Sequence, residues 1–360
     1  MSLLRSVARE LKNDFVGAAT TPLDLYRELR YTAAGVRSGE ISPMRPLKTA
    51  GLTLGALVAV LTLLFPIYWI LISALSGTGG SIHSVDGLRL LPEKPSLQPF
   101  IWVIGDLILP SYEIGLGIPF SDSTLVFNTP GFELLDASDY GVESPSGFKK
   151  FFWNSLMVAI PTVILGMCLI VPAAYALSRR EFIGRRKILF GYVLLTQVGG
   201  GLGIALLIGL YTVFVQVGIN DNKLALSVYY AATAVPFNTW LLKTYMDGIP
   251  VSYEEAAVVD GAPAWRVVVE VILPLSKAGL ATVFIFTFLT GWTEFVVAQT
   301  LLGTENYTLP VGLFSLVSEY SVPWARFSAF ALTFASPIML VYLFAQRYIE
   351  GGLSFGGMEG

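Results

Sequence analysis

Six apolar stretches separated by polar segments dominate the chain. They cover residues 49–75, 152–177, 188–217, 224–242, 278–302 and 327–344. A bilayer core needs about 20 apolar residues per helix, so each stretch predicts a membrane-spanning helix, although 224–242 barely reaches that length. The stretch 188–217 is long enough that we expect a tilted or broken helix, with the break in the glycine-rich segment 199–203. The pattern predicts an all-α membrane protein with six transmembrane helices.

Composition agrees with a chain that is largely dissolved in lipid. Hydrophobic residues make up 54% of the 360 residues and charged residues 14%, and the mean hydropathy is +0.65. A soluble domain is considerably less apolar. The single cysteine, Cys168, and the single histidine, His83, provide no disulfide and no pair of metal ligands.

No catalytic signature stands out. The chain contains no Ser/His/Asp arrangement, no His-Glu-x-x-His and no nucleotide-binding loop, since no Lys-Ser or Lys-Thr follows the glycines at 199–203. We therefore expect a protein that is not an enzyme by itself, binds no cofactor or metal and has no nucleic-acid partner.

Basic residues predict the orientation in the membrane. They cluster before residue 49 and again at 179–187, whereas the segment 77–151 is acidic. Because cytoplasmic segments are enriched in Lys and Arg, both termini are expected in the cytoplasm of a multi-pass cell-membrane protein. The domains expected are a basic cytoplasmic segment 1–47, a first transmembrane helix 48–76, an extracytoplasmic loop 77–151, a core 152–346 with a cytoplasmic loop 243–277, and a cytoplasmic tail 347–360.

Two of these segments have alternative interpretations. The basic arm 1–47 either lies near anionic lipid headgroups or is a solvated flank. The loop 77–151 is long for a connector, so it is either a cap that contacts a substrate-delivery protein or a lid that packs on itself.

A polar island interrupts the apolar pattern after residue 251. We expect Ser252 to cap a short helix, Glu254 and Glu255 to lie in its first turn, where the helix dipole favours acids, and Gly261 to end it. The segment is either a docking surface or an ordinary solvated connector between two membrane helices.

The spacing in this island resembles a known signature. Glu255-Ala256-Ala257, three residues, Gly261, nine residues, then Val271, any residue, Leu273 and Pro274 is similar to the signature of ABC importer permeases, with Val271 where the family has Ile. In that family the loop is the coupling helix, which seats in a groove of the cytoplasmic ATPase subunit. The resemblance implies the coupling and ATPase-docking residues Glu254, Glu255, Ala256, Ala257, Asp260 and Gly261.

From residue 154 onward the chain resembles the smaller permease subunit of maltose-type carbohydrate importers. The segments 291–298, 307–313 and 346–357 carry this resemblance. It implies the type I ABC importer permease fold, half of a sugar pathway, a second homologous permease, two ATPase subunits that bind ATP and Mg, and an extracytoplasmic solute-binding protein. Residues 1–47 and the large outer loop depart from the small-subunit pattern.

The same resemblance gives the C-terminal tail a role. In the maltose-type subunit this tail reaches between the two ATPase subunits, and the residues concerned here are Gly352, Leu353, Ser354, Phe355, Gly356 and Gly357. Leu353 and Phe355 would be anchors on an extended strand. The alternative is a disordered chain end.

Polar residues within the apolar stretches are the candidates for the pathway or gate. Glu294, next to Thr293, is costly in lipid and should face protein or water, either at a gate or in a structural hydrogen bond to Thr293 or a neighbouring helix. Asn238 and Trp240 either line the route or pack between helices. The competing function, an ion- or proton-coupled secondary transporter, would be expected to show internal repeats and more charge within the membrane.

Overall fold

The computed structural model describes residues 44–77, 83–84, 87–88, 91–92, 95–105, 107–109, 113–117, 124–128, 132–135, 137–317 and 322–353. Residues 1–43 of the predicted basic segment 1–47 therefore lie outside the described residues. The chain divides into two units between Trp69 and Ile70. The first unit contains most of helix α2, and the second contains the end of α2 and every later element.

Long helices coincide with the predicted apolar stretches. They are α2 (Met44–Leu75), α4 (Phe148–Arg179), α5 (Arg185–Val217), α6 (Lys223–Asp247), α10 (Lys277–Thr293) and α13 (Trp324–Leu353). Within the described part of the chain, Lys48–Leu75, Phe148–Arg179 and Trp324–Tyr348 are long and apolar enough to cross a membrane on their own. A six-span count stays a prediction.

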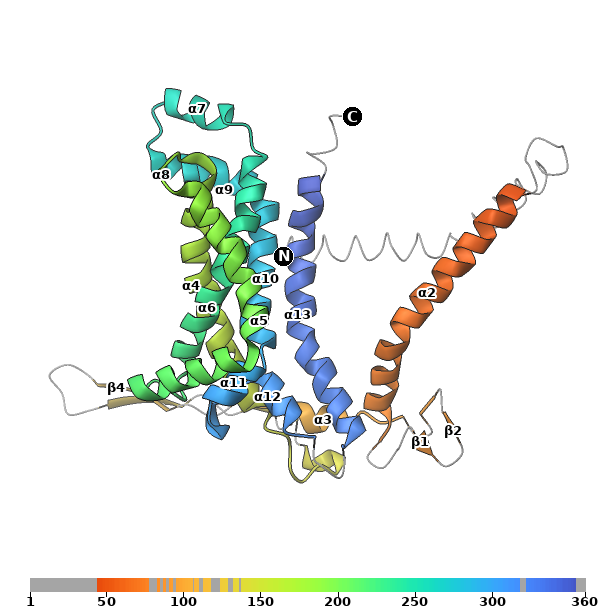
Figure 1. The fold of residues 1–360 in the computed structure, drawn as a ribbon. Helices are drawn as coiled ribbons and strands as arrows, with labels where there is room; N and C mark the ends of the chain where they lie inside the picture. Colours follow the sequence, from red (N-terminus) through yellow and green to blue (C-terminus); the bar gives the residue numbers. More distant parts are fainter. Residues whose placement is uncertain are drawn as a thin grey trace. The chain divides into compact units, whose positions relative to one another are not determined.

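Shorter elements connect the long helices. They are α3 (Gln98–Ile104), η1 (Ser138–Tyr140), α7 (Ser252–Val259), α8 (Ala264–Arg266), η2 (Val267–Ile272), α9 (Leu273–Leu275), α11 (Val296–Leu301), η3 (Thr304–Asn306) and α12 (Leu309–Phe314). Figure 1 shows α7 at one end of the bundle and α11 and α12 at the other.

Helices α4, α6 and α10 form the centre of the bundle, with α13 packed on α10 and α5 on α6. On α4, buried Val158, Thr162, Gly166 and Ile170 recur every four residues, which places them on one face. Between α4 and α10, a methyl group at Gly291 would lie 2.9 Å from the Cα of Ala159. Small residues therefore allow these two backbones to touch, as is typical of packing within membranes.

Helix α5 is broken, as the glycine-rich segment predicted. Gly203 has φ 30° and ψ −109°, which is not helical, and the helix continues on either side of it. The break follows from the sequence, because glycine adopts conformations that other residues resist.

The end of the bundle opposite α7 is tied together by polar contacts. The Asn154 side-chain amide donates to the carbonyl oxygens of Glu305 and Tyr307 at 2.9 and 3.0 Å. The Lys223 ammonium donates to the Asn154 Oδ1 at 2.9 Å. The start of α4, the start of α6 and the connection between α11 and α12 are thereby fixed to one another.

The predicted outer loop contains strands as well as helix. Its strands pair antiparallel as β1 (His83–Ser84) with β2 (Gly87–Leu88), β3 (Leu107–Leu109) with β6 (Phe132–Leu135), and β4 (Glu113–Gly117) with β5 (Thr124–Asn128). Trp102 and Val103 of α3 are buried in one core with Phe148 of α4 and Phe330 of α13. Part of the loop therefore packs on the ends of the helices.

The C-terminal tail differs from the expectation. Helix α13 continues through Gly351, Gly352 and Leu353, so an extended strand beginning at these residues is wrong. Residues 354–360, including Ser354, Phe355, Gly356 and Gly357, lie outside the described residues.

Candidate functional site

Helix α7 projects from the bundle between the end of α6 and the run from α8 to α9 (Figure 1). Its N-cap residue is Val251, and no side chain caps the first turn. The expectation that Ser252 is the cap is therefore wrong, since Ser252 is the first helical residue. Glu254 and Glu255 lie in the first turn as predicted, where they complement the helix dipole.

Glu254 turns toward the bundle. Its Oε1 lies 2.5 Å from the Nε of Arg179 at the end of α4, and the two side chains expose only 12% and 10% of their surface. The Nε–H bond does not point at this oxygen, so the contact is an ion pair without an aligned hydrogen bond. The Tyr175 hydroxyl donates to Oε2 at 3.2 Å. Glu254 is therefore engaged within the chain.

Arg179 contacts the α7 region at a second point. Its Nη2 donates to the carbonyl oxygen of Ile249, in the connection from α6 to α7, at 2.7 Å. In the sequence, Arg179 stands out only as one of several basic residues that predict the orientation, and Tyr175 carries no signal of its own. Neither residue is near α7 in the sequence, so only the folded chain reveals the contact.

Away from the Glu254 contact, α7 is exposed in the described structure. The exposed residues include Tyr253, Glu255, Ala256, Val258 and Val259, followed by Asp260 just after the helix. Val259 is 86% exposed and Val258 61%, so an apolar surface lies between two acidic side chains. Ala257 is half-buried. The predicted docking residues are thus divided, with Glu255, Ala256 and Asp260 outward and Glu254 inward.

Gly261 ends this segment with a left-handed backbone, at φ +81°. Its N–H donates to the carbonyl of Val258 at 2.9 Å, and the N–H of Ala262 donates to that of Ala257 at 3.0 Å. These bonds satisfy carbonyl groups at the end of the helix, a common role of glycine at this position. The prediction that Gly261 supplies the stop is confirmed.

After Gly261 the chain runs through α8, η2 and α9 to Leu275 and then bends by 83° into α10. Ile272 is fully buried within this run and packs in one core with Ile170 of α4 and Leu242 of α6. The motif residues Val271, Leu273 and Pro274 therefore belong to a segment that anchors the α7 region to the bundle.

Glu294 lies at a break between α10 and α11, so a single span over 278–302 is wrong. Its carboxylate accepts the N–H of Val297 at 3.0 Å and of Ala298 at 3.2 Å, and it accepts a hydrogen bond from the Tyr230 hydroxyl of α6. The acid therefore stabilises the start of α11 and joins it to α6. The Thr293 hydroxyl donates to the Leu289 carbonyl within its own helix, so of the two expected structural partners of Glu294 it is the neighbouring helix, through Tyr230, that is found.

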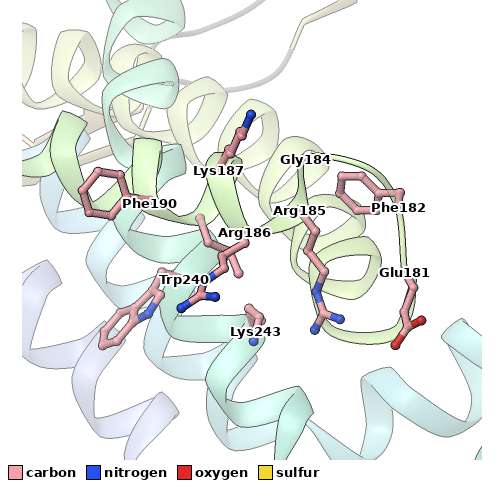
Figure 2. A pocket seen from close by; sticks show the side chains of 10 residues that line it. Glu181, Phe182, Gly184, Arg185, Arg186, Lys187, Phe190, Trp240 and Lys243 are labelled. Carbon is pink, nitrogen blue, oxygen red and sulfur yellow. The ribbon is translucent and has the colours of Figure 1, made fainter.

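The polar residues of α6 have different surroundings. Asn238 is buried, and its amide donates to the carbonyl of Ala234 at 2.9 Å. Trp240 is 44% exposed. It lines an open cavity of about 1050 Å³ between the α4–α5 connection and α6 (Figure 2). The side chains around this cavity are mainly basic and aromatic: Glu181, Phe182, Arg185, Arg186, Lys187, Leu189, Phe190, Trp240 and Lys243.

Comparison with known proteins identifies the family. Residues 151–354 match the family model described as "Binding-protein-dependent transport system inner membrane component", which is more than half of the chain. The chain belongs to this family. The predicted resemblance to carbohydrate ABC importer permeases is thereby confirmed, and so is the prediction of a transport subunit rather than an enzyme.

Relatives of this permease extend beyond the matched region. The chain is 28% identical over 319 residues to an inner membrane ABC transporter permease protein of Escherichia coli (strain K12), which covers 88% of this chain and 98% of the relative. It is 34% identical over 235 residues to the maltose/maltodextrin transport system permease protein of Salmonella typhimurium, covering 64% of this chain and 79% of the relative.

A solved structure supports the fold. A permease chain in the crystal structure of a bacterial ABC transporter that imports the acidic polysaccharide alginate superimposes with a TM-score of 0.62. The match covers 86% of this chain and 98% of the other, at 21% identity. The predicted type I importer permease fold is confirmed, and the protein is a multi-pass component of the cell membrane.

Proposed function

We propose that this permease is the small membrane subunit of an ATP-driven saccharide importer and forms half of its translocation pathway. The observation that carries the proposal is the exposed surface of α7, which includes Glu255, Val258 and Val259, while Glu254 of the same helix is held to α4. An exposed apolar patch rimmed by polar groups is typical of a protein interface.

The proposed role as a permease subunit implies several partner subunits. Two ATPase subunits would dock on the coupling helices of this chain and of a second homologous permease, and they would bind the ATP and Mg. This chain would supply no cofactor site. An extracytoplasmic solute-binding protein would deliver the substrate, and lipid would surround the apolar helices.

The substrate proposed is a di- or oligosaccharide of the maltose type. The relative from Salmonella typhimurium, whose name states maltose and maltodextrin, supports this choice. Trp240 and Asn238 would contribute to the pathway on α6, and Glu294 with Thr293 would act at a gate where α10 ends. The break at Glu294 suits such a role, because non-helical backbone within membranes is found where it is buried in protein or lines a cavity.

The orientation proposed places α7 in the cytoplasm. The same end of the bundle carries Arg179, Arg180, Arg185, Arg186 and Lys187, and basic residues favour the cytoplasmic side. In a Cys168→Ala background, Ser252→Cys should react with a membrane-impermeant thiol reagent only after the membrane is opened, whereas Ser144→Cys should react in intact cells. Both positions are exposed. The reverse pattern would overturn the topology.

Uptake by the reconstituted complex tests the function. Proteoliposomes that contain this permease, its sister permease and ATPase should accumulate saccharide from a panel of maltotriose, galactotriose and alginate trisaccharide, given the solute-binding protein and internal ATP. Collapse of the proton and sodium gradients with ionophores should leave the uptake unchanged. Uptake that needs a gradient and no ATP would instead establish the secondary transporter.

A further inference from the structure

The two faces of α7 serve different contacts. Residues 254 and 255 are neighbours in the sequence, and about 100° separates successive side chains around a helix. Glu254 faces α4, and Glu255 is exposed on the other side. A partner that binds the exposed face therefore leaves the Glu254 contact intact.

Arg179 holds this region at two points. Its guanidinium reaches the Glu254 carboxylate on α7 and the Ile249 carbonyl just before α7. Arginine is suited to this because its planar group presents several N–H donors in a fixed fork. Tyr175, one helical turn earlier on α4, adds the hydroxyl bond to the same carboxylate. The three side chains Tyr175, Arg179 and Glu254 are hereafter the α4–α7 lock.

The lock connects α7 to the part of the chain that forms the core. Helix α4 packs along α6 and α10. Ala174 and Leu177, which flank Tyr175, are buried, and Ala174 shares a core with Leu242 of α6 and Val283 of α10. A movement of α7 that carries α4 with it would therefore move the bundle.

Helix α7 is joined to the bundle through a non-helical connection at 248–251 on one side and the turn at Gly261 on the other. Hinges are commonly a few such residues at the ends of elements, so without the lock α7 could be displaced while α4 stays in place. We propose that Arg179 is a positioning residue that fixes α7 to α4, so that displacement of α7 by the ATPase is transmitted to the pathway. This inference rests on the proposed docking of α7 to an ATPase.

The test compares Arg179→Gln with its neighbour. Arg180 is exposed, and its charge acts on Tyr175 although its side chain takes no part in the contacts of the α4–α7 lock, so Arg180→Gln is a matched control that removes a nearby charge and keeps those contacts. In proteoliposomes with the sister permease, ATPase and solute-binding protein, the readout is saccharide imported per ATP hydrolysed. The probe is radiolabelled maltotriose, or alginate trisaccharide where the wild type takes that instead.

We expect Arg179→Gln to lower this ratio by about tenfold, within the range common for coupling between two sites, while ATP hydrolysis and ATPase co-purification persist. Arg180→Gln should keep the wild-type ratio. Glu254→Gln removes the same ion pair but leaves the Arg179 bond to Ile249, so it should lower the ratio no further than Arg179→Gln does, and the double variant should be no worse than Arg179→Gln alone. A wild-type ratio for Arg179→Gln, or losses that multiply in the double variant, would overturn the lock.

The double variant also guards against misfolding. Because Arg179 and Glu254 are both replaced, no unpaired buried charge remains, and the double variant should assemble even where a single variant does not. A lowered ratio of saccharide imported per ATP in the double variant supports transmission through the lock, and a wild-type ratio refutes it. Val259→Arg, on the exposed face, tests the docking separately through ATPase co-purification. Normal co-purification with Val259→Arg would refute the docking, whereas its loss together with a wild-type ratio for Arg179→Gln would refute the lock alone.

Discussion

Gly291→Ala is expected to destabilise the helix bundle by about 1–3 kcal/mol, the usual cost of overpacking a core. The added methyl group would lie 2.9 Å from the Cα of Ala159 and 3.2 Å from the side chain of Thr162. Ala159 is fully buried, so the backbones of α4 and α10 would have to separate. The midpoint of thermal unfolding in detergent should fall clearly.

Gly209→Ala is the matched control on α5. Nothing lies within 4 Å of the methyl group that it would add. Because alanine favours helix over glycine by about 1 kcal/mol, this change should leave the stability equal or slightly higher. Equal losses in the two variants would show that the contact between α4 and α10 is not what makes Gly291 necessary.

Gly261→Val is expected to abolish coupled uptake while the protein still inserts. A β-branched residue resists the left-handed backbone that Gly261 adopts at φ +81°, and such strain costs about 1–3 kcal/mol. The turn would rearrange and lose the bonds from Gly261 and Ala262 that close α7. Saccharide uptake and ATPase co-purification in the reconstituted complex provide the measurement.

Gly261→Asn separates backbone strain from side-chain volume. Nothing lies within 4 Å of a methyl group at this position, so space is available, and asparagine tolerates the left-handed conformation better than valine. Uptake should therefore survive in large part with Asn and not with Val. Full uptake with Val would contradict the proposed need for this turn.

The sequence predicted the helices well because apolar length is a local property. Five of the six stretches each fall on one long helix, the stretch 278–302 begins on α10 but runs past its end, and the glycines at 199–203 correctly marked the break in α5. Gly261 was predictable for the same reason, since a glycine after a short polar helix is itself a signal to stop.

Contacts between distant residues could not be predicted in this way. The stretch 278–302 stays apolar on both sides of Glu294, so hydropathy gave no sign that α10 ends there. At the break, the Tyr230 hydroxyl and the first N–H groups of α11 donate hydrogen bonds to the Glu294 carboxylate. The inward turn of Glu254 likewise depends on Arg179, 75 positions earlier.

Two other departures have local causes. Ser252 failed as a cap because the helix begins one residue earlier than a cap at 252 requires, with Val251 already in a helical backbone. The tail was expected to be extended, with Leu353 as one of its anchors, but Gly351, Gly352 and Leu353 continue α13. Glycine lowers helix stability without preventing the helix.

The early end of α10 also bears on how a short helix is accommodated in a membrane. With 17 residues at a rise of 1.5 Å, α10 is about 25 Å long, shorter than the roughly 30 Å hydrocarbon core of a typical membrane. Helix α4, with 32 residues, is about 48 Å long and exceeds it. Because α10 packs against α4, α6 and α13 at the centre of the bundle, neighbouring protein and not lipid surrounds its short end. A helix too short to span the hydrocarbon core is thus accommodated here without any adjustment of bilayer thickness.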